Sequence, residues 1–120
     1  MTGCPHPSGG GHTIEYDYDV AVVGAGPAGS RCARNLAAGG LKVALLEEHR
    51  RIGVPSHCSG LVSPRTLEEA DIREPIVANR LTGAYVHTAG GGELTLGGGD
   101  TRALTIDRVR LDELLCEQAQ

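Results

Sequence analysis

Three glycines and a later carboxylate are spaced in this chain as a dinucleotide site requires. Gly24, Gly26 and Gly29 form a G-x-G-x-x-G run, and Glu47 follows them. In such a run the first glycine permits a sharp turn, the second leaves room for a diphosphate, and the third lets a helix pack closely on a strand. Glu47 could accept hydrogen bonds from the hydroxyls of an adenosine ribose, and its charge would repel a 2′-phosphate. The pattern therefore predicts a dinucleotide other than NADP.

Further positions support this interpretation, because 18 of the 120 residues are glycine and short glycine spacings arise by chance. The longer pattern G-x-G-x-x-G-x-x-x-A-x-x-L-x-x-x-G-x-x-V-x-x-x-E is matched at five places beyond the three glycines. These five are Ala33, Leu36, Gly40, Val43 and Glu47. The alternative is that the glycines only shape a tight turn and that Glu47 is a solvated charge at a strand end.

These residues must be positioned by a strand, a helix and a second parallel strand. Residues 19–23 are a short apolar run expected at the centre of a parallel sheet, covered on both faces. A helix should begin near Pro27, pack through Ala33, Leu36 and Ala37, and stop at the Gly39-Gly40 pair. Residues 43–46 should form the second strand. The start of the helix then faces the diphosphate, so Pro27 and Ala28 are candidate cofactor-binding residues, as is Glu48 beside Glu47.

Composition bounds the class of protein. The chain has no Phe or Trp and three Tyr, so its core must come from Val, Leu, Ile and Ala. A formal charge of −4 with scattered basic residues gives no reason to expect nucleic acid. No apolar run reaches the length of a transmembrane helix, and the first residues lack the plan of a signal peptide. We therefore expect a cytoplasmic protein.

The cysteine spacing predicts neither a disulfide scaffold nor a zinc site, because the chain has no C-x-x-C pair. The cysteines are Cys4, Cys32, Cys58 and Cys116. Cys4 with His6 and His12 could be interpreted as a metal cluster, but these residues lie in a Gly/Pro/Ser-rich stretch. We expect residues 1–16 to be a disordered leader without metal, and residues 17–120 to be part of one folded domain.

The second half of the chain predicts less regular structure. A loop is expected over residues 49–63, then a short helix over 64–70 capped by Ser63. Extended segments near 82–88, 93–96 and 103–106 are separated by glycine triplets, which indicate an antiparallel β excursion or, alternatively, disorder. Asp107 should cap a last helix bearing Leu111, Leu114 and Leu115. No third parallel strand is apparent, so we expect an incomplete, truncated α/β domain.

Several segments together resemble a known family. They are the glycine-rich motif through Glu47, residues 52–61 (IGVPSHCSGL), residues 63–65 (SPR) and residues 106–108 (IDR) followed by 111–112 (LD). With them the chain resembles the geranylgeranyl reductase family, FAD-dependent oxidoreductases with a fold like that of p-hydroxybenzoate hydroxylase. The resemblance runs over residues 18–120 and covers only the amino-terminal part of a family member.

The resemblance implies roles for particular residues. Gly24, Gly26 and Gly29 would hold the diphosphate of FAD and Glu47 its ribose. Arg108 would lie against the cofactor, and Cys58 would lie in a loop bordering the flavin and the substrate. From the residues alone, Arg108 could equally be a solvated helix-start residue and Cys58 a small apolar filler, since only His57 adjoins Cys58 in sequence to lower its pKa. Leu111 stands where many members have an aromatic residue.

The resemblance also implies a reaction. Family members reduce carbon-carbon double bonds of prenyl chains with hydride from reduced FAD, which NAD(P)H or another donor recharges. A prenyl lipid substrate and peripheral membrane contact of a full-length protein would follow. The alternatives are a related flavin monooxygenase or halogenase, a catalytically inactive nucleotide-binding fragment and, with less support from the elements after Glu47, an NAD-dependent dehydrogenase.

Overall fold

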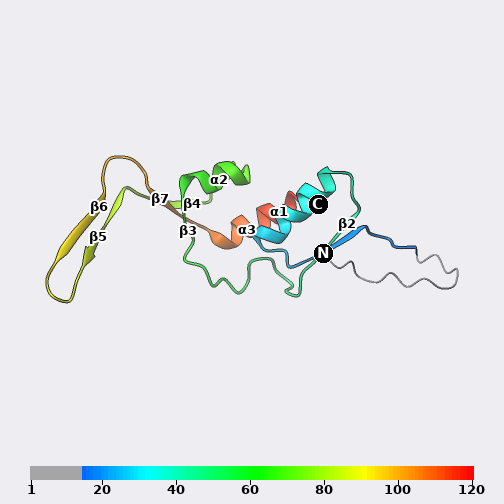
Figure 1. Cartoon of the computed structure of the whole chain (residues 1–120), viewed down its shortest axis with the longest axis horizontal. Coiled ribbons are helices and arrows are strands. Elements are labelled where there is room, and N and C mark those ends of the chain that lie inside the picture. The colour runs from blue at the N-terminus through cyan, green and yellow to red at the C-terminus, as the bar shows by residue number, and fades with distance from the viewer. Residues whose placement is uncertain (1–14) are drawn as a thin grey trace, which may run out of the picture.

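The computed structural model describes residues 15–120. In chain order the elements are β1 (Val20–Val23), α1 (Pro27–Ala38), β2 (Val43–Leu46), β3 (Leu61–Val62), α2 (Pro64–Ala70), β4 (Val77–Leu81), β5 (Gly83–His87), β6 (Glu93–Gly97), β7 (Ala103–Ile106) and α3 (Arg108–Glu117) (Figure 1). Cys4, His6, His12 and nearly all of the predicted leader lie outside the described residues.

β1, α1 and β2 form the predicted parallel unit. β1 pairs in parallel with β2, from Val20 opposite Val43 to Val23 opposite Leu46. α1 begins at Pro27 as predicted and ends at Ala38, with Gly39 as its C-cap. Gly40 then adopts a φ of 88°, a conformation that favours glycine. The chain is thus an α/β protein with a Rossmann-like strand-helix-strand unit, as the sequence predicted.

One expectation about this unit is wrong. β1 does not lie at the centre of a covered sheet, because among residues 15–120 its only partner is β2. Side chains alternate between the two faces of a strand, and α1 covers only one face. Val23 is consequently 83% exposed. α1 also buries Ser30 and Ala33, whereas Ala37, which we expected in the packed face, is exposed.

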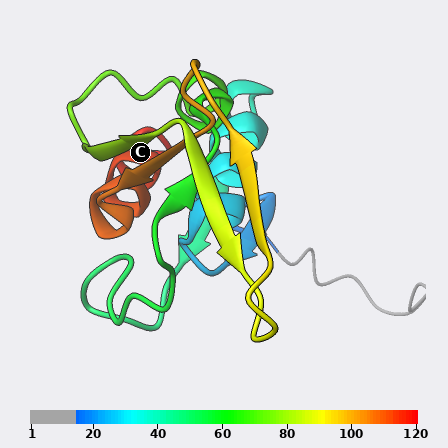
Figure 2. The ribbon, with the colours of Figure 1, turned by 90° about the vertical axis from the view of Figure 1, so that its left-hand side faces the viewer.

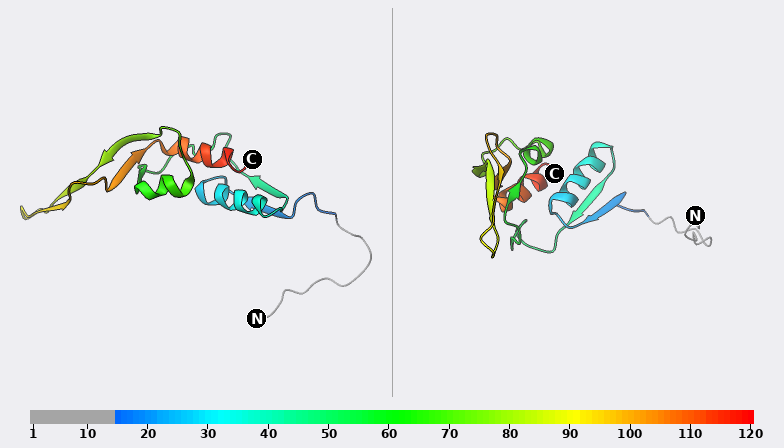
Figure 3. Two further views of the ribbon diagram at one scale, coloured as in Figure 1. Left: turned by 90° about the horizontal axis from the view of Figure 1, so that it is seen from above. Right: turned by 60° about the vertical axis from the view of Figure 1, so that its left-hand side comes forward.

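A second, antiparallel sheet carries the apolar core. Its strand order is β3-β7-β4, and α3 packs against it. The buried cluster consists of Ile76, Leu104, Ile106, Leu111 and Leu115. α3 also packs along α1, so it joins the core to the parallel unit (Figures 1 and 3). The apolar stripe predicted on α3 is confirmed at Leu111 and Leu115, and Leu114 is partly buried against the same cluster.

β5 and β6 form a hairpin that extends away from the helices (Figure 1), and Figure 2 shows its two strands side by side. The pairing is antiparallel, from Gly83 opposite Gly97 to His87 opposite Glu93, and Gly91 lies in the turn with a φ of 82°. The predicted β excursion is therefore confirmed, and its glycine triplets are turns and connections rather than disorder. Every residue of both strands is exposed.

The two predicted helix caps have different outcomes. Asp107 caps α3 as expected, because its carboxylate accepts a hydrogen bond from the Arg110 backbone N–H at 3.0 Å. Ser63 occupies the cap position of α2, but its hydroxyl lies 3.2 Å from the Thr66 hydroxyl and makes no cap bond to the backbone. No helix within residues 15–120 is long and apolar enough to cross a membrane.

Candidate cofactor site

The glycine run forms the turn between β1 and α1, and two of its glycines are sterically required. Gly24 adopts a φ of 96° and donates its N–H to the Leu46 carbonyl at 2.7 Å, which fixes the turn to the neighbouring strand. A Cβ on Gly29 would overlap the carbonyl oxygen of Gly24. The helix can therefore pack this closely on the turn only if Gly29 has no side chain.

Gly26 has a different environment. A Cβ built at Gly26 would meet nothing within 4 Å, so the space above this residue is open. Gly26 immediately precedes Pro27, the first residue of α1. The backbone N–H groups of the first turn, where Ala28 and Gly29 lie, have no acceptor within the helix. The arrangement presents free donors and the positive end of the helix dipole to this open space.

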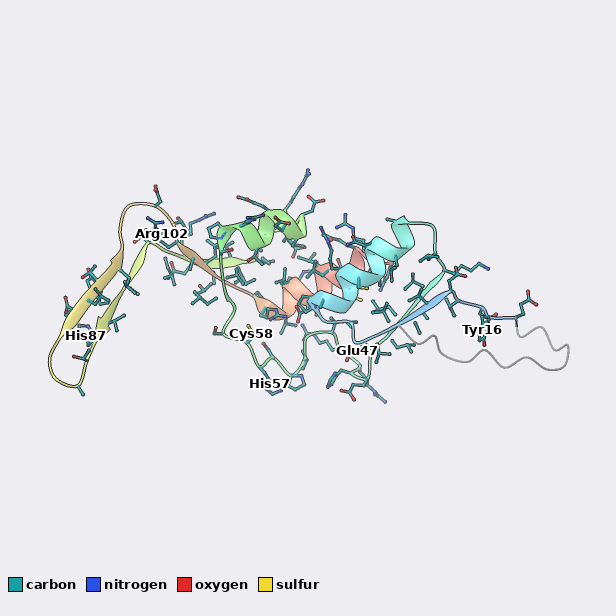
Figure 4. All side chains as sticks on the ribbon, viewed as in Figure 1. Tyr16, Glu47, His57, Cys58, His87 and Arg102 are labelled. Carbon is teal, nitrogen blue, oxygen red and sulfur yellow. The ribbon has the colours of Figure 1, made fainter. Side chains whose placement is uncertain are left out.

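Glu47 lies directly beside this turn (Figure 4). Its Oε2 accepts a hydrogen bond from the Ala25 backbone N–H at 2.8 Å, and its Oε1 accepts from the His49 backbone at 3.0 Å and lies 2.6 Å from His49 Nδ1. These donors, the Ala25 N–H first, lower the pKa of Glu47 from 4.5 to about 2. Glu47 is therefore not simply a solvated charge at a strand end.

Glu48 lies apart from these contacts. Its side chain is 86% exposed, and its Oε1 is 3.9 Å from His49 Nε2. His49, which the sequence analysis did not single out, contacts the Glu47 carboxylate with both its backbone and its ring. The only sequence feature that could have pointed to His49 is its proximity to Glu47, and proximity in sequence alone does not predict a side-chain contact.

A cavity of about 380 Å³ adjoins the Glu47 carboxylate. Ala25, Glu47 and the β2 residues Val43 and Leu45 line part of the cavity, and Ile52 and residues at the carboxyl end of the chain line the rest. Cys116, Ala119 and Gln120 are the residues at that end of the chain which contribute to the wall. The cavity therefore places an acidic group, a backbone turn and apolar side chains around one space, a combination typical of small-molecule sites.

Cys58 and Arg108, which are far apart in sequence, come together at the start of α3. The Gly60 backbone N–H, and after it the Arg108 guanidinium, hold the pKa of the Cys58 thiol below its ordinary value. Cys58 is exposed, like Cys32, whereas Cys116 is buried, and all three are free thiols. Figure 4 shows Cys58 in the loop that passes beneath the start of α3. Cys58 is therefore not an apolar filler.

Arg108 is held in turn by Asp112. Its Nε and Nη2 both lie 3.0 Å from Asp112 Oδ1, one helical turn further along α3. Asp112 is only 6% exposed, and burial raises the pKa of its carboxyl group while the Arg108 charge opposes that rise. Arg108 is thus a fixed, partly buried cation rather than the solvated residue of the alternative interpretation.

Two glycines position the Cys58 loop, and the sequence analysis did not assign them a role. Gly53 and Gly60 adopt φ values of 73° and 70°. A Cβ on Gly53 would lie 3.2 Å from the Asp112 Cβ, so the loop passes close to α3. The Gly60 carbonyl accepts a hydrogen bond from the Ile106 N–H at 2.9 Å, which fixes the end of the loop to β7. The sequence feature that could have pointed to these two glycines is their place in a long loop.

A parallel strand-helix-strand unit with a glycine turn, open space at the helix start and a carboxylate at the end of the second strand defines a dinucleotide-binding protein of the Rossmann class. Residues 19–81, more than half of the chain, match the profile of a family described as FAD dependent oxidoreductase. The chain belongs to this family.

Individual relatives confirm the resemblance to geranylgeranyl reductases. The chain is 36% identical to a digeranylgeranylglycerophospholipid reductase of Methanococcus vannielii, over 85% of this chain and 26% of the relative. It is 36% identical to a geranylgeranyl diphosphate reductase of Rhodobacter capsulatus, over 85% of this chain and 25% of the relative.

A solved structure agrees. A geranylgeranyl bacteriochlorophyll reductase-like protein of Thermoplasma acidophilum matches with a TM-score of 0.75 and 34% identity, over 85% of this chain and 27% of that protein. The chain spans about a quarter of the length of these three proteins.

Proposed function

We propose that this chain binds FAD and is the amino-terminal, cofactor-binding part of a flavoprotein that reduces carbon-carbon double bonds of prenyl chains. The observation that carries the cofactor assignment is the glycine turn. Gly24 has a φ of 96°, which favours glycine, a Cβ on Gly29 would overlap the Gly24 carbonyl oxygen, and the space above Gly26 is open. The family match supports FAD as the dinucleotide.

The diphosphate of FAD would lie over Gly26 at the start of α1. The free N–H groups of Ala28 and Gly29 can donate to its oxygens, and the helix dipole stabilises a negative charge there by about 0.3–1 kcal/mol at an exposed position. Gly26 contributes by having no Cβ, so the phosphate oxygens can approach the backbone.

The adenosine end would lie in the cavity beside Glu47. The carboxylate oxygens have lone pairs left after bonding Ala25 and His49, and these can accept hydrogen bonds from ribose hydroxyls. Because the pKa of Glu47 is lowered to about 2, the group is ionised at neutral pH and disfavours a 2′-phosphate. The proposal therefore excludes an NADP-type adenosine at this place.

Cys58 and Arg108 would border the flavin end. Bound FAD would supply hydride transfer, which is the chemistry of the cofactor and not of the chain. The contribution of the chain is a fixed guanidinium, held by Asp112, beside a thiol whose pKa is lowered. This pair can hold a negative charge or a proton at one edge of the site. Leu61, exposed on β3 next to the Cys58 loop, offers apolar contact to a prenyl chain.

The reaction is supported by the names of the relatives. Two of them are reductases of prenyl compounds. A prenyl lipid substrate, NAD(P)H as electron donor, cytoplasmic location and peripheral contact with a membrane are parts of the same proposal. The whole reaction belongs to a protein about four times as long, since the chain matches about a quarter of each relative.

Titration of the purified chain with FAD tests the cofactor proposal, with flavin fluorescence as the readout. We expect FAD to bind more tightly than ADP and NADP to bind at least tenfold more weakly than NAD. Gly26→Val should abolish binding without unfolding the chain, because its side chain would fill the diphosphate space. FAD binding that is unchanged in Gly26→Val would contradict the proposal.

The reaction is tested on the chain joined to the remaining domains of a relative. Under anaerobic conditions, a geranylgeranyl lipid should reoxidise the reduced flavin and yield a saturated product. If the reduced flavin instead consumes oxygen rapidly in the presence of an aromatic substrate, the monooxygenase or halogenase alternative is correct.

A further inference from the structure

His49 makes two contacts to the same oxygen of the Glu47 carboxylate. Its backbone N–H donates to Glu47 Oε1 at 3.0 Å, and its ring Nδ1 lies 2.6 Å from that atom. The other oxygen, Oε2, accepts the Ala25 N–H at 2.8 Å and has no further partner among the described residues. The two oxygens of this carboxylate are therefore unequally engaged.

The ring contact is a hydrogen bond that His49 donates. Glu47 is ionised at neutral pH, because the Ala25 N–H and the donors of His49 lower its pKa to about 2. An ionised carboxylate can only accept hydrogen bonds, so ring Nδ1 must carry a hydrogen, whether the imidazole is neutral or protonated. The other ring nitrogen, Nε2, lies 3.9 Å from Glu48 Oε1, which is beyond hydrogen-bond distance. Glu47 is thus the carboxylate that orients the ring.

These contacts limit what Glu47 can accept from a ligand. A carboxylate has about four acceptor positions, roughly two on each oxygen. On Oε1 both positions are taken by His49, and on Oε2 one is taken by Ala25. The position that is left lies on Oε2. The Glu47 side chain is 20% exposed and lines the cavity of about 380 Å³, so a ligand in that cavity can reach the carboxylate.

We propose that His49 is a specificity-determining residue of the adenosine site, because it restricts Glu47 to a single ribose hydroxyl. An adenosine ribose carries a 2′ and a 3′ hydroxyl, and a carboxylate with a free position on each oxygen can accept both. With Oε1 occupied by His49, Glu47 binds one hydroxyl and not the other. This role of His49 depends on the proposed function, in which the adenosine of FAD lies beside Glu47.

Competition with FAD for the 120-residue chain, followed by flavin fluorescence, measures the affinities of ADP, 2′-deoxy-ADP and 3′-deoxy-ADP. We expect one deoxy analogue to bind about tenfold more weakly than ADP, as for loss of one charge-assisted hydrogen bond, and the other to bind within about twofold of ADP. The analogue that loses affinity identifies the hydroxyl that Glu47 binds. Equal losses for the two analogues would show that both hydroxyls are bound, which overturns the proposal.

Three variants test whether His49 sets this limit. His49→Ala removes the ring and keeps the backbone N–H, which frees a position on Oε1, so both deoxy analogues should then bind more weakly than ADP, each by roughly threefold or more. His49→Asn has an amide nitrogen as many bonds from Cα as ring Nδ1, and should retain the wild-type pattern. Glu48→Gln, at a side chain 86% exposed, is the matched control and should also retain it. The wild-type pattern in His49→Ala would overturn the proposal.

The ring of His49 offers a readout that needs no ligand. Nitrogen-15 NMR of the histidine-labelled chain should show that the neutral His49 ring carries its hydrogen on Nδ1 and not on Nε2, because the hydrogen bond to Glu47 selects that tautomer. The signal that is missing from the spectrum of His49→Asn identifies the residue. A hydrogen on Nε2 of the neutral ring would show that Nδ1 does not donate to Glu47, which contradicts the proposal.

The results with FAD separate the role of His49 from the proposed function. If FAD binds and neither deoxy analogue loses affinity, Glu47 does not contact the ribose, so the role of His49 is wrong while FAD binding stands. If the folded wild-type chain binds neither FAD nor ADP, the proposed function is wrong, and the role of His49 is wrong with it.

Discussion

The Glu47 carboxylate accepts the backbone N–H of Ala25 at 2.8 Å, so the end of β2 holds the glycine turn that follows β1. Glu47 thus lies at the adenosine end of the proposed cofactor and is also hydrogen-bonded to the backbone that would hold the diphosphate. The position of the turn depends on a charge from the neighbouring strand, so Glu47 contributes both to cofactor binding and to folding.

Two different replacements of Glu47 should separate its effect on cofactor binding from its effect on folding. Glu47→Gln keeps an oxygen that can accept from Ala25, so we expect FAD affinity to fall roughly tenfold, as for loss of one charge-assisted hydrogen bond, with a small loss of stability. Glu47→Ala removes the acceptor altogether and should reduce both. Flavin titration and urea unfolding measure the two quantities. Equal losses of both quantities in Glu47→Gln would show a purely structural carboxylate.

Acid should remove the contribution of Glu47 to stability. The pKa of Glu47 is lowered from 4.5 to about 2 in the folded chain, so its stabilising contribution is complete above pH 4.5 and is lost as the pH falls toward 2. Urea midpoints measured from pH 6 to pH 2 should fall less steeply for Glu47→Gln than for the wild type. Glu48→Gln, at a side chain 86% exposed, is the matched control and should follow the wild type.

Two alanine substitutions in the glycine run should have opposite effects. Gly29→Ala places a Cβ onto the Gly24 carbonyl oxygen and should destabilise the chain by about 1–3 kcal/mol, a typical cost of overpacking. Gly26→Ala enters open space and should leave thermal stability nearly unchanged while weakening FAD binding. Thermal unfolding and flavin titration of the same two variants check this. A stable Gly29→Ala variant would show that helix and turn can separate at little cost.

Cys58 should react faster than an ordinary cysteine near neutral pH. Its pKa is lowered by the Gly60 N–H and by Arg108, so its thiolate forms at lower pH. Alkylation by iodoacetamide, followed residue by residue with mass spectrometry, should show a pH midpoint below that of Cys32, which is also exposed. Arg108→Gln should move the Cys58 midpoint upward and leave Cys32 unchanged. A Cys58 midpoint unaffected by Arg108→Gln would contradict the contact.

The parallel unit was predictable because its requirements are local. Gly24 adopts a φ that favours glycine, and Gly29 must lack a side chain because the Gly24 carbonyl oxygen lies against it, so their spacing alone indicates the turn. Pro27 and Gly39 mark the ends of α1 for similar reasons. Glu47 could be placed beside the turn because parallel strands end at the same edge of a sheet.

The antiparallel sheet was less predictable. β4 was missed because its middle residues, including Asn79 and Arg80, are exposed and show no apolar alternation. β3 has two residues and lies at the end of a long loop. Cys58 and Arg108 come together only because the Cys58 loop passes back across α3. No local sequence pattern indicates that path. Val23 is exposed because β1 pairs only with β2 among the described residues. The number of strands in a sheet is another property that the sequence of one short segment cannot reveal.

The Gly60-Ile106 hydrogen bond fastens the Cys58 loop to the antiparallel sheet, whereas Glu47 belongs to the parallel one. An extended ligand that touches both Glu47 and Cys58 would therefore bridge two separately built halves of the molecule. The binding energy of this ligand would add to the modest packing of α1 on α3. With the ligand bound, the two halves would then unfold in a single cooperative transition.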